Sequence, residues 1–460
     1  MLPALRALRR PDPRPRRSGR ALSTGVLVTV LATVGATVGA AVVVAGPAQA
    51  RNVVTPGNFT GFAFDQCVAP TQSSMNAWLR SSPYLAVGIY ISGASRGCVD
   101  QPNLSPRWIR RQLRNGWRLL PITLGPQAWC TTRERYLHQV RINPSTRDSF
   151  AKARAQGRAE ARKTVRAAKR LGIFRHSTLW YDIEAFSISR HDCRESALSF
   201  LGAWTRQMHK RHYVSGVYSS AASGIKMLDD ARALRRGTYK MPDRVWIADW
   251  NGHANTSSSY VRHAGWQPHK RVHQYLGGHP ERHGGVTIDI DRSWVDLGRG
   301  SWTAREPAHC GAKASYNFRR YRTIDVGARS AQVRTVKCLL SNSKRFAGKI
   351  DGVYGAKLGA AVSRYRTSRG LSACTATTQR TWVALLSAGD DRVLKRGSAH
   401  PAVRRVQRAL NAADHAGLRI TGIYKRSTAR AVKRYQHDHH RARSGVVGPG
   451  LWRKLHAGVR

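Results

Sequence analysis

The sequence predicts an α/β protein in which an irregular (β/α)8 barrel, of the TIM type, is followed by two small all-α modules. Between about residues 58 and 297, short apolar runs alternate with stretches of helical character, which is the pattern of a β/α fold. From about residue 320 the sequence repeats itself at an offset of 70 residues, which is typical of a duplicated module. The expected domains are a leader over 1–50, a barrel over 51–300, a linker over 301–319, and modules over 320–389 and 390–460.

Eight runs of strand-forming residues account for the expected barrel, and a fold of this kind takes about 250 residues. A helix rich in Ala, Arg and Lys is expected from about Thr146 to Leu171, and Gly172 ends it. Several other connections are too short for a full helix, so we expect an irregular barrel. The runs are Gly61–Asp65, Ala86–Ile91, Arg118–Thr123, Thr178–Glu184, Val214–Tyr218, Val245–Ala248, Val272–Tyr275 and Val286–Asp289.

Two carboxylates, Asp182 and Glu184, stand two positions apart in the fourth run. Side chains alternate along a strand, so both acids face the same side, with backbone positions about 6.6 Å apart. Like charges on one face cost stability, which favours a functional use. Such a pair suits glycoside hydrolysis, in which one carboxyl protonates the leaving oxygen and another stabilises positive charge on the sugar. The structural alternative is a strand end where the acids meet solvent or a basic partner.

Other polar and aromatic residues also fall where the predicted strands end, and in such barrels the chemistry lies at the carboxyl ends of the strands. Aromatic rings there can stack on sugar faces, although an aromatic residue beside a strand is more often core. Asp249 and Asp291 follow the same pattern. The predicted catalytic residues are Glu184 and Asp182, and the predicted substrate-binding residues are Asp65, Asp289, Gln274, Tyr275 and Trp250.

The first 50 residues have the pattern of a signal peptide. Arginine-rich sequence from Arg6 to Arg20 precedes an apolar run from about Gly25 to Gly46, and Ala48-Gln49-Ala50 has the form of a cleavage site. The apolar run is also long enough to be an uncleaved anchor, but its small residues favour cleavage. Arg16-Arg17 hints at twin-arginine export, and the sequence leaves the export route open. We expect a secreted or wall-held protein without a later membrane span.

The formal net charge of +53 predicts an anionic environment. Nucleic acid is the usual first candidate, but export favours anionic cell-wall polymers, so we expect no specific nucleic-acid partner. All seven cysteines lie beyond the leader, and no close C-x-x-C pair suggests zinc. Disulfides are the expected use, for instance Cys67 with Cys98 and Cys130 with Cys193. An odd number leaves one thiol without a mate.

The repeat in the last third is seen at matched positions. Gly352-Val-Tyr354 matches Gly422-Ile-Tyr424, and Trp382 matches Trp452. Within the second copy, Val403, Val406 and Leu410 recur at helical spacing. Each copy is therefore expected to be a small helical bundle, with binding as its natural role and a spacer as the structural alternative.

Three motifs of the second copy resemble the peptidoglycan-binding module found beside many wall hydrolases. They are Val-x-x-Val-Gln-x-x-Leu over 403–410, Thr-Gly-Ile-Tyr over 421–424 and Ala-Val-x-x-Tyr-Gln over 431–436. The first copy departs from the pattern, with Lys337 and Arg366 where the module usually has Gln. The resemblance implies a three-helix fold with a shallow groove for wall peptide and sugar.

The first half resembles the glycoside-hydrolase-like domain of secreted actinobacterial proteins, which is itself similar to family 25 lysozymes. In those lysozymes the glutamate of Asp-x-Glu is the general acid, so the resemblance implies this role for Glu184. The preceding aspartate maps to Asp182, and the aspartates of the first and last strands map to Asp65 and Asp289. The matching segments, which keep one order, are 61–67, 87–90, 116–117, 125–128, 181–184, 216–218, 246–250, 273–275 and 285–289.

The sequence leads to three hypotheses. The first is an exported glycosidase acting on peptidoglycan glycan strands, with Glu184 as general acid and Asp182 as the stabilising carboxylate, and with no metal or cofactor. The second is a non-catalytic wall protein that keeps the barrel as a carbohydrate-binding scaffold, since fold does not fix function. The third is an exported nucleic-acid-binding protein, which rests on charge alone.

Overall fold

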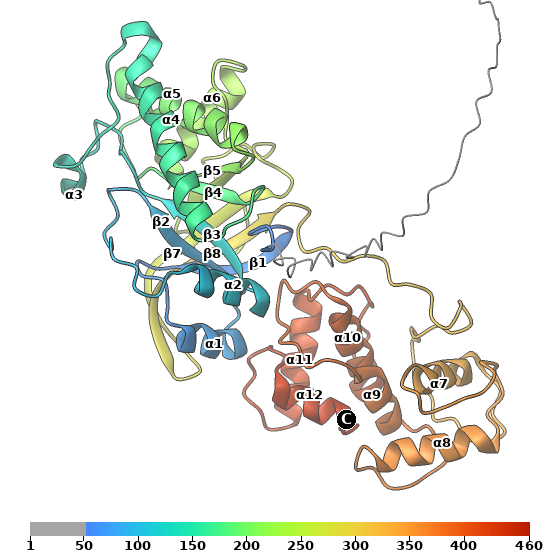
Figure 1. Cartoon of the computed structure of the whole chain (residues 1–460). Coiled ribbons are helices and arrows are strands. Elements are labelled where there is room, and N and C mark those ends of the chain that lie inside the picture. The colour runs from blue at the N-terminus through green and yellow to red at the C-terminus, as the bar shows by residue number, and fades with distance from the viewer. Residues whose placement is uncertain (1–51) are drawn as a thin grey trace, which may run out of the picture. The chain divides into compact units, whose positions relative to one another are not determined.

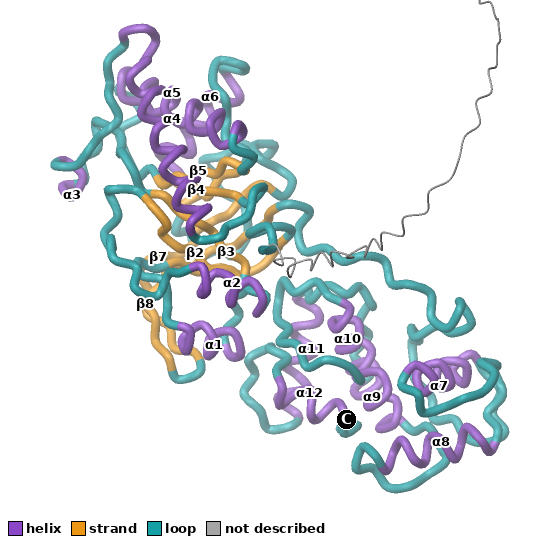
Figure 2. The backbone as a smooth tube through the Cα atoms, in the orientation of Figure 1, coloured by secondary structure: helices purple, strands orange, loops and turns teal. Residues whose placement is uncertain are grey.

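The computed structural model describes residues 52–460, and the predicted leader lies outside the described residues. Its first part is a closed barrel of eight strands (Figure 1), and its last part consists of helices joined by loops (Figure 2). This confirms the predicted fold class. Across residues 52–460, no helix has both the length and the apolar character needed to cross a bilayer.

The barrel follows the chain order from β1 to β8, and helices separate most of the strands. Strands β1 to β7 run parallel to one another. No helix lies between β6 and β7, which accords with the expected irregularity. The elements are β1 (Phe59–Asp65), α1 (Gln72–Ser81), β2 (Ala86–Ser92), α2 (Pro106–Asn115), β3 (Arg118–Thr123), α3 (Glu134–Leu137), α4 (Arg147–Arg170), β4 (Thr178–Asp182), α5 (His191–Lys210), β5 (Val214–Ser220), η1 (Ala221–Ile225), α6 (Lys226–Leu234), β6 (Arg244–Ala248), β7 (Lys270–His283) and β8 (Val286–Leu297).

The last two strands differ from the prediction. Instead of two short parallel runs, β7 and β8 form a long antiparallel hairpin, and β8 is also antiparallel to β1. Gly284 and Gly285, both with positive φ, make the turn between them, as expected of a Gly-Gly hairpin connection. Because β8 runs in reverse, its first half lies at the barrel end where β1 to β7 finish. The register accordingly places Asp291 opposite Asp65.

Local sequence explains where the outer helices begin and how closely they pack. Helix α2 begins after Ser105, whose side chain accepts a hydrogen bond from the Trp108 backbone, and Gly116 ends it in the left-handed conformation. Helices α4 and α5 lie against each other on the outside of the barrel (Figure 1). Gly157 permits this close packing, because a Cβ there would lie 2.3 Å from the Phe200 carbonyl oxygen.

Large aromatic side chains fill the barrel interior, as is usual for closed barrels of this size. Trp180 and Trp246 are fully buried and meet edge to face, with ring centroids 5.5 Å apart. Gly216 accommodates Trp180, since a Cβ at this glycine would approach the indole ring to 2.4 Å. The Trp246 Nε1–H donates to Ser293 Oγ at 3.0 Å. The interior is therefore a packed core that supports a polar layer at one end.

The helical part contains two halves whose hydrogen bonds recur 70 residues apart. Trp382 Nε1 donates to the Arg322 carbonyl at 2.8 Å, and Trp452 Nε1 donates to the Arg392 carbonyl at 2.8 Å. The backbone bridges between residues 324 and 377 and between 394 and 447 also correspond. The helices are α7 (Ala331–Asn342), α8 (Ala356–Thr367), α9 (Gln379–Ser387), α10 (Pro401–Asp414), α11 (Arg426–Asp438) and α12 (Pro449–His456).

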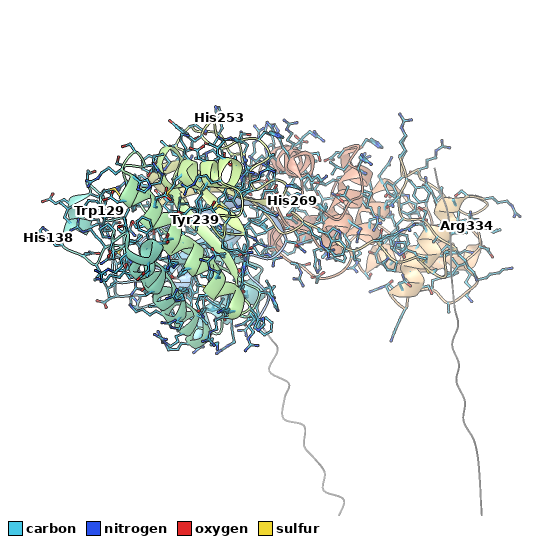
Figure 3. The ribbon with its side chains drawn as sticks, turned by 90° about the horizontal axis from the view of Figure 1, so that it is seen from above. Trp129, His138, Tyr239, His253, His269 and Arg334 are labelled. Carbon is cyan, nitrogen blue, oxygen red and sulfur yellow. A yellow bond between two sulfur atoms is a disulfide. The ribbon has the colours of Figure 1, made fainter. Side chains whose placement is uncertain are left out.

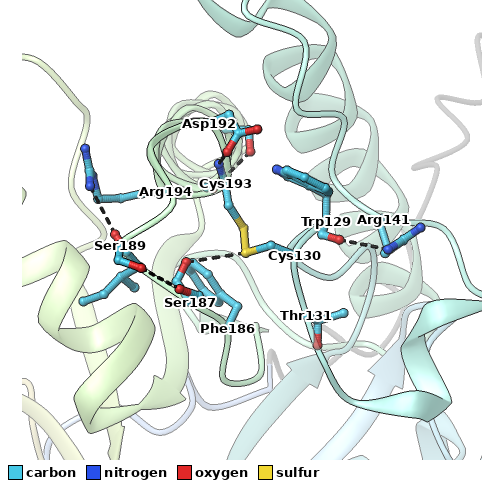
Figure 4. The surroundings of a disulfide bond; sticks show 12 residues. Trp129, Cys130, Thr131, Arg141, Phe186, Ser187, Ser189, Asp192, Cys193 and Arg194 are labelled. Atoms are coloured by element: carbon cyan, nitrogen blue, oxygen red, sulfur yellow. Dashed lines mark hydrogen bonds between the residues drawn. A yellow bond between two sulfur atoms is a disulfide. The ribbon is translucent and has the colours of Figure 1, made fainter.

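Three disulfides cross-link the described part of the chain. Cys67–Cys98 and Cys130–Cys193 are the two pairs expected from the sequence, and Cys310–Cys338 is the third. Cys374 is the remaining thiol. Figure 4 shows that Cys130–Cys193 joins the loop after β3 to the start of α5. This loop matters for function because its side chains reach the end of β4.

Candidate active site

Four carboxyl groups, from β1, from β4 and the residues that follow it, and from β8, lie at the barrel end where the parallel strands finish. Asp65 and Asp182 are buried, with only 4% and 2% of their surfaces exposed. Glu184 is more open, with a side chain 22% exposed, and Asp291 lies opposite Asp65. Asp65, Glu184 and Asp291 line one hollow of about 180 Å³, and Asp182 lies directly beneath them against Tyr90, which also lines it. The structure therefore brings the two predicted catalytic acids to one place.

Asp182 is the most enclosed of these acids. Its Oδ2 accepts a hydrogen bond from the Tyr90 hydroxyl at 3.3 Å, while its Oδ1 is buried without a partner. Burial raises the pKa of Asp182 well above its usual range, and the negative charges of Glu184 and Asp65 raise it further. Asp182 therefore keeps its proton to a higher pH than an ordinary aspartate does.

Glu184 lies just beyond the end of β4 and takes its partners from the loop after β3. Its Oε1 accepts from the Tyr136 hydroxyl at 3.4 Å, and its Oε2 lies 3.5 Å from Arg133 Nη2. The Arg133 side chain is 54% exposed, so this is an open pair at the rim of the hollow and not a buried ion pair. Such open pairs are weak and exchange readily.

Gln127 holds the backbone that carries both acids. It is 1% exposed, its Nε2 donates to the Asp182 carbonyl at 2.9 Å, and its Oε1 accepts from the Glu184 N–H at 2.8 Å. This two-point contact fixes Glu184 relative to Asp182 after the regular strand has ended. The same loop is tied down by the Cys130–Cys193 disulfide and by Trp129, labelled in Figure 3, over which the Arg190 guanidinium lies at 4.1 Å.

The second pair of acids is bridged by Gln274, a predicted substrate-binding residue. Its Nε2 lies 3.3 Å from Asp65 Oδ1 and 3.3 Å from Asp291 Oδ2. Its Oε1 accepts from the Tyr218 hydroxyl at 2.9 Å and from Trp250 Nε1 at 3.0 Å. Burial raises the pKa of Asp65, with a further contribution from the charge of Asp291, and burial also raises the pKa of Asp291.

A glycine makes room for the Asp65 side chain. A Cβ at Gly88 would lie 2.5 Å from Asp65 Cβ and 3.3 Å from the Trp246 ring, closer than carbon atoms can approach without movement. Gly88 thus lets the acid cross the top of the tryptophan core and reach Gln274.

Two predicted site residues lie elsewhere, and the predictions for them are corrected by the geometry. Asp289 is exposed and pairs with Pro280 in the hairpin beyond the hollow. The position at the site that we expected for Asp289 is occupied by Asp291, which lies opposite Asp65. Tyr275 follows Gln274 in β7, where the pairing with β8 shifts register. Its ring meets the ring of His273 edge to face and does not line the hollow; it lies near Glu281 and Arg292, and burial raises its pKa to about 12.

Trp250, in contrast, lies beside Gln274 at this end of the barrel. Its side chain is 64% exposed, its Nε1 binds Gln274, and its ring covers Gly277, where a Cβ would lie 2.1 Å from Trp250 Cζ2. An exposed indole fixed at its polar edge offers a flat face suited to stacking on a sugar ring.

Several residues of the site were not predicted. They include cations at the rim of the hollow, Arg96 and Arg135, and the wall formed by the Cys67–Cys98 disulfide. Asp291 was noted among the acids at strand ends but given no role, and the Gly-Gly pair before β8 was the further signal for it, because a hairpin turn there reverses the strand. Gln127 falls within the matching segment 125–128, although no role was predicted for it. No sequence signal locates Tyr136 or Arg133, whose positions depend on the course of a long loop. Within residues 52–460, no group of three or more His, Cys, Asp or Glu side chains is arranged to hold a metal ion.

A second hollow lies in the last helical half. It has a volume of about 490 Å³ and is lined by Gln407 and by basic side chains, among them Arg419, Lys425 and Arg430. Gln407 is 1% exposed. Its Oε1 accepts from the N–H groups of Thr421 and Gly422, and its Nε2 donates to the Ile423 carbonyl and to two threonine hydroxyls.

Comparisons with known proteins agree with this architecture. Residues 76–295 match the family of Rv2525c-like, glycoside hydrolase-like domains, and residues 399–455 match the peptidoglycan-binding domain family. No curated protein matches the chain.

Three solved structures show similarity to this chain at low identity. One is an uncharacterized B. stearothermophilus protein (18% identity, 51% of this chain and 95% of that one, TM-score 0.31). Another is the Mycobacterium tuberculosis Tat-secreted protein Rv2525c in complex with HEPES (13% identity, 52% and 96%, TM-score 0.34). The third is the modular autolysin LytC from Streptococcus pneumoniae (12% identity, 51% and 46%, TM-score 0.33).

Proposed function

Because this chain joins an Rv2525c-like, glycoside hydrolase-like domain to a peptidoglycan-binding domain, we propose that it is an exported glycosidase acting on the glycan strands of peptidoglycan. The observation that carries the proposal is the group of carboxyls at the end of the barrel, three of which line one hollow while Asp182 accepts a hydrogen bond from Tyr90 in its wall. Glycoside hydrolysis needs two carboxyl groups in different protonation states. A site with one enclosed acid and one rim acid supplies different surroundings for the two.

Glu184 is the general acid in this proposal, because it is the acid of the pair that lies open at the rim. To protonate a leaving oxygen, its carboxyl must exchange Arg133 and Tyr136 for the substrate, and open pairs of this kind allow that exchange. Asp182 stabilises the positive charge that develops at the anomeric carbon, or orients a substrate N-acetyl group that attacks it. Both roles need the ionised carboxylate, which in the second accepts a hydrogen bond from the N-acetyl N–H, so the raised pKa of Asp182 moves the onset of activity to higher pH.

Substrate binding is divided between the barrel and the last helical half. Gln274 and Trp250 contribute a fixed amide and an exposed ring beside the acids. The hollow of about 180 Å³ is below the ~300–1,000 Å³ usual for small-molecule sites, so only a short part of a glycan chain enters it. The larger hollow around Gln407 takes wall peptide and sugar, and its basic rim suits the carboxylates of wall peptides.

The domain boundaries and the cellular location follow from the same proposal. Residues 1–50 are a signal peptide, 51–300 the catalytic barrel, 301–319 a linker, and 320–389 and 390–460 a tandem repeat of wall-binding modules. Disulfides and a peptidoglycan-binding domain both support a wall-associated protein outside the cell. A second attachment site raises the local concentration of the barrel on its polymer.

The contacts of Glu184 favour one alternative, a non-catalytic carbohydrate-binding barrel. Both of its oxygens already have protein partners, Tyr136 and Arg133, and a barrel that only binds sugar would keep those contacts. In that case the same acids would hold sugar hydroxyls.

The test compares Glu184→Gln with Asp289→Asn, which removes an exposed acid outside the hollow. Reducing ends released from purified peptidoglycan are measured for both variants and the wild type. We expect Glu184→Gln to lose about 10²- to 10⁴-fold in rate and Asp289→Asn to retain the wild-type rate. Equal release by Glu184→Gln and the wild type would exclude Glu184 as the acid. Binding without release by any of the three would support the non-catalytic barrel.

A further inference from the structure

The first helical half carries a basic hollow that the proposed enzyme mechanism does not use. It has a volume of about 830 Å³ and lies beside the start of α7, whose side chains, including Arg334, are seen in Figure 3. Four arginines line it: Arg319, Arg320, Arg322 and Arg329. All four are exposed, and in residues 52–460 none of their guanidinium groups has a hydrogen bond or an ion pair. The neighbouring acid Asp325 accepts from the Val326 N–H instead.

The backbone that presents these arginines is held firmly. Gln332 accepts from the Arg322 N–H at 2.9 Å and donates to the Arg320 carbonyl at 2.8 Å. Trp382 donates to the Arg322 carbonyl at 2.8 Å. Four like charges are thus kept close together on an ordered loop, and mutual repulsion makes that arrangement unfavourable unless a ligand neutralises it.

The equivalent loop of the second half provides an internal comparison. At the offset of 70 residues, Asp390 replaces Arg320 and Ala399 replaces Arg329. Arg392, the equivalent of Arg322, pairs with Asp390 at 3.2 Å, and Arg405 pairs with the same carboxylate at 2.6 Å. The same backbone therefore carries a neutralised loop in one half and an unneutralised loop in the other.

We propose that the hollow lined by Arg319, Arg320, Arg322 and Arg329 binds a phosphodiester-linked polymer of the cell wall. Each planar guanidinium can pair with two oxygens of one phosphate. A chain with one negative charge per repeat supplies several partners along one hollow. The test distinguishes this ligand from two others: wall polyanions that contain no phosphate, and nucleic acids. The inference rests on the proposed wall location but not on catalysis.

The test uses the whole mature chain and a charge-matched pair of variants. Arg320→Gln/Arg329→Gln removes two charges from the hollow, and Arg158→Gln/Arg162→Gln removes two exposed charges from α4. Co-sedimentation is measured with nuclease-treated walls, before and after hydrofluoric acid removes their phosphodiester polymers. We expect the hollow variant to bind untreated walls about 10-fold more weakly, and the α4 variant to stay within about 2-fold of the wild type. All three proteins should bind acid-treated walls equally.

Each of the other possible results leads to a different conclusion. Equal loss in both variants would show general charge attraction and would overturn the proposal. Wild-type binding that is unchanged by acid treatment would assign the hollow no phosphodiester ligand, while leaving peptidoglycan binding intact. Absence of binding to acid-treated walls alone would contradict the proposed peptidoglycan function and not this inference. Tighter hollow-dependent binding of a single-stranded oligonucleotide than of the extracted wall polymer would reassign the site to nucleic acid.

Discussion

The hollow at the barrel end and the hollow around Gln407 differ in whether a buried polar side chain beside them is fully hydrogen-bonded. In the second helical half, Gln407 is neutral, and both atoms of its amide are fully bonded to the turn at Thr421 to Ile423. In the barrel, Asp182 is an acid with one oxygen buried and unbonded. Satisfied buried groups stabilise a fold, whereas unsatisfied ones destabilise it. The comparison teaches that Gln407 is part of the framework and that Asp182 is kept at the expense of stability.

The strongest test of this contrast is Gln407→Ala. The substitution leaves the N–H groups of Thr421 and Gly422 without their acceptor and empties a packed position. We expect a loss of about 3 kcal/mol in the free energy of unfolding. Calorimetry of the whole mature chain should show the helical transition at lower temperature with the barrel transition unchanged. A change below ~0.5 kcal/mol would mean that the amide is not a structural element.

Gly88→Ala tests the packing beneath the acids. The added methyl group would collide with Asp65 Cβ, which the backbone of β1 holds in place. Overpacking of this kind costs about 2 kcal/mol, and it should also displace Asp65 from Gln274 and lower glycan affinity. The control must be a glycine without positive φ, because an added Cβ would strain the backbone at a residue such as Gly116. Gly355→Ala, with φ −90 and nothing near its Cβ, is suitable and should have little effect.

Asp182→Asn should change the free energy of unfolding in the opposite direction to Gln407→Ala. An amide carries no charge to bury, so we expect the barrel to gain about 1 kcal/mol at neutral pH while losing glycan cleavage. Chemical denaturation at a fixed pH measures the gain. A destabilised variant would show that the carboxylate is required by the framework, as Gln407 is.

The pH dependence of unfolding sharpens the same comparison. Burial raises the pKa of Asp65, Asp182 and Asp291 in the folded state. As pH rises through the ordinary aspartate range, the unfolded carboxyls lose their protons first, so the free energy of unfolding falls until the folded carboxyls also titrate. Four other acids of the barrel, Glu195, Asp229, Asp230 and Glu281, have lowered pKa values and act in the opposite direction, so the contribution of Asp182 is measured as a difference. We expect the stability of Asp182→Asn relative to the wild type to rise as pH rises through that range. A difference that does not change with pH would contradict the assignment.

The smallest expected effect concerns the two aromatic residues beside Gln274. Tyr275→Phe removes a hydroxyl from a residue that does not line the hollow, so stability should change by less than ~0.5 kcal/mol and cleavage should not change. Trp250→Phe removes the hydrogen bond to Gln274 and should weaken glycan binding. Isothermal titration with a soluble glycan fragment separates them, and equal losses would place Tyr275 at the site after all.

The strands were predictable because their apolar runs are bounded by turns, and β3 coincides with the expected Arg118–Thr123. Asp65, Asp182, Glu184 and Gln274 were predictable because strand ends converge in any barrel. Asp289 and Tyr275 were wrongly placed because a one-residue change of register, or a reversed strand, moves a side chain to another face. The role of Gln127 and the positions of Arg133 and Tyr136 could not be predicted, since tertiary contacts and a disulfide set the course of their loop.

The Cys67–Cys98 bond forms part of the wall around the acids. Thiols in the cytosol are kept reduced. Under the proposed function this part of the wall would therefore form only after export, and the cleft would be completed only where its polymer substrate is found.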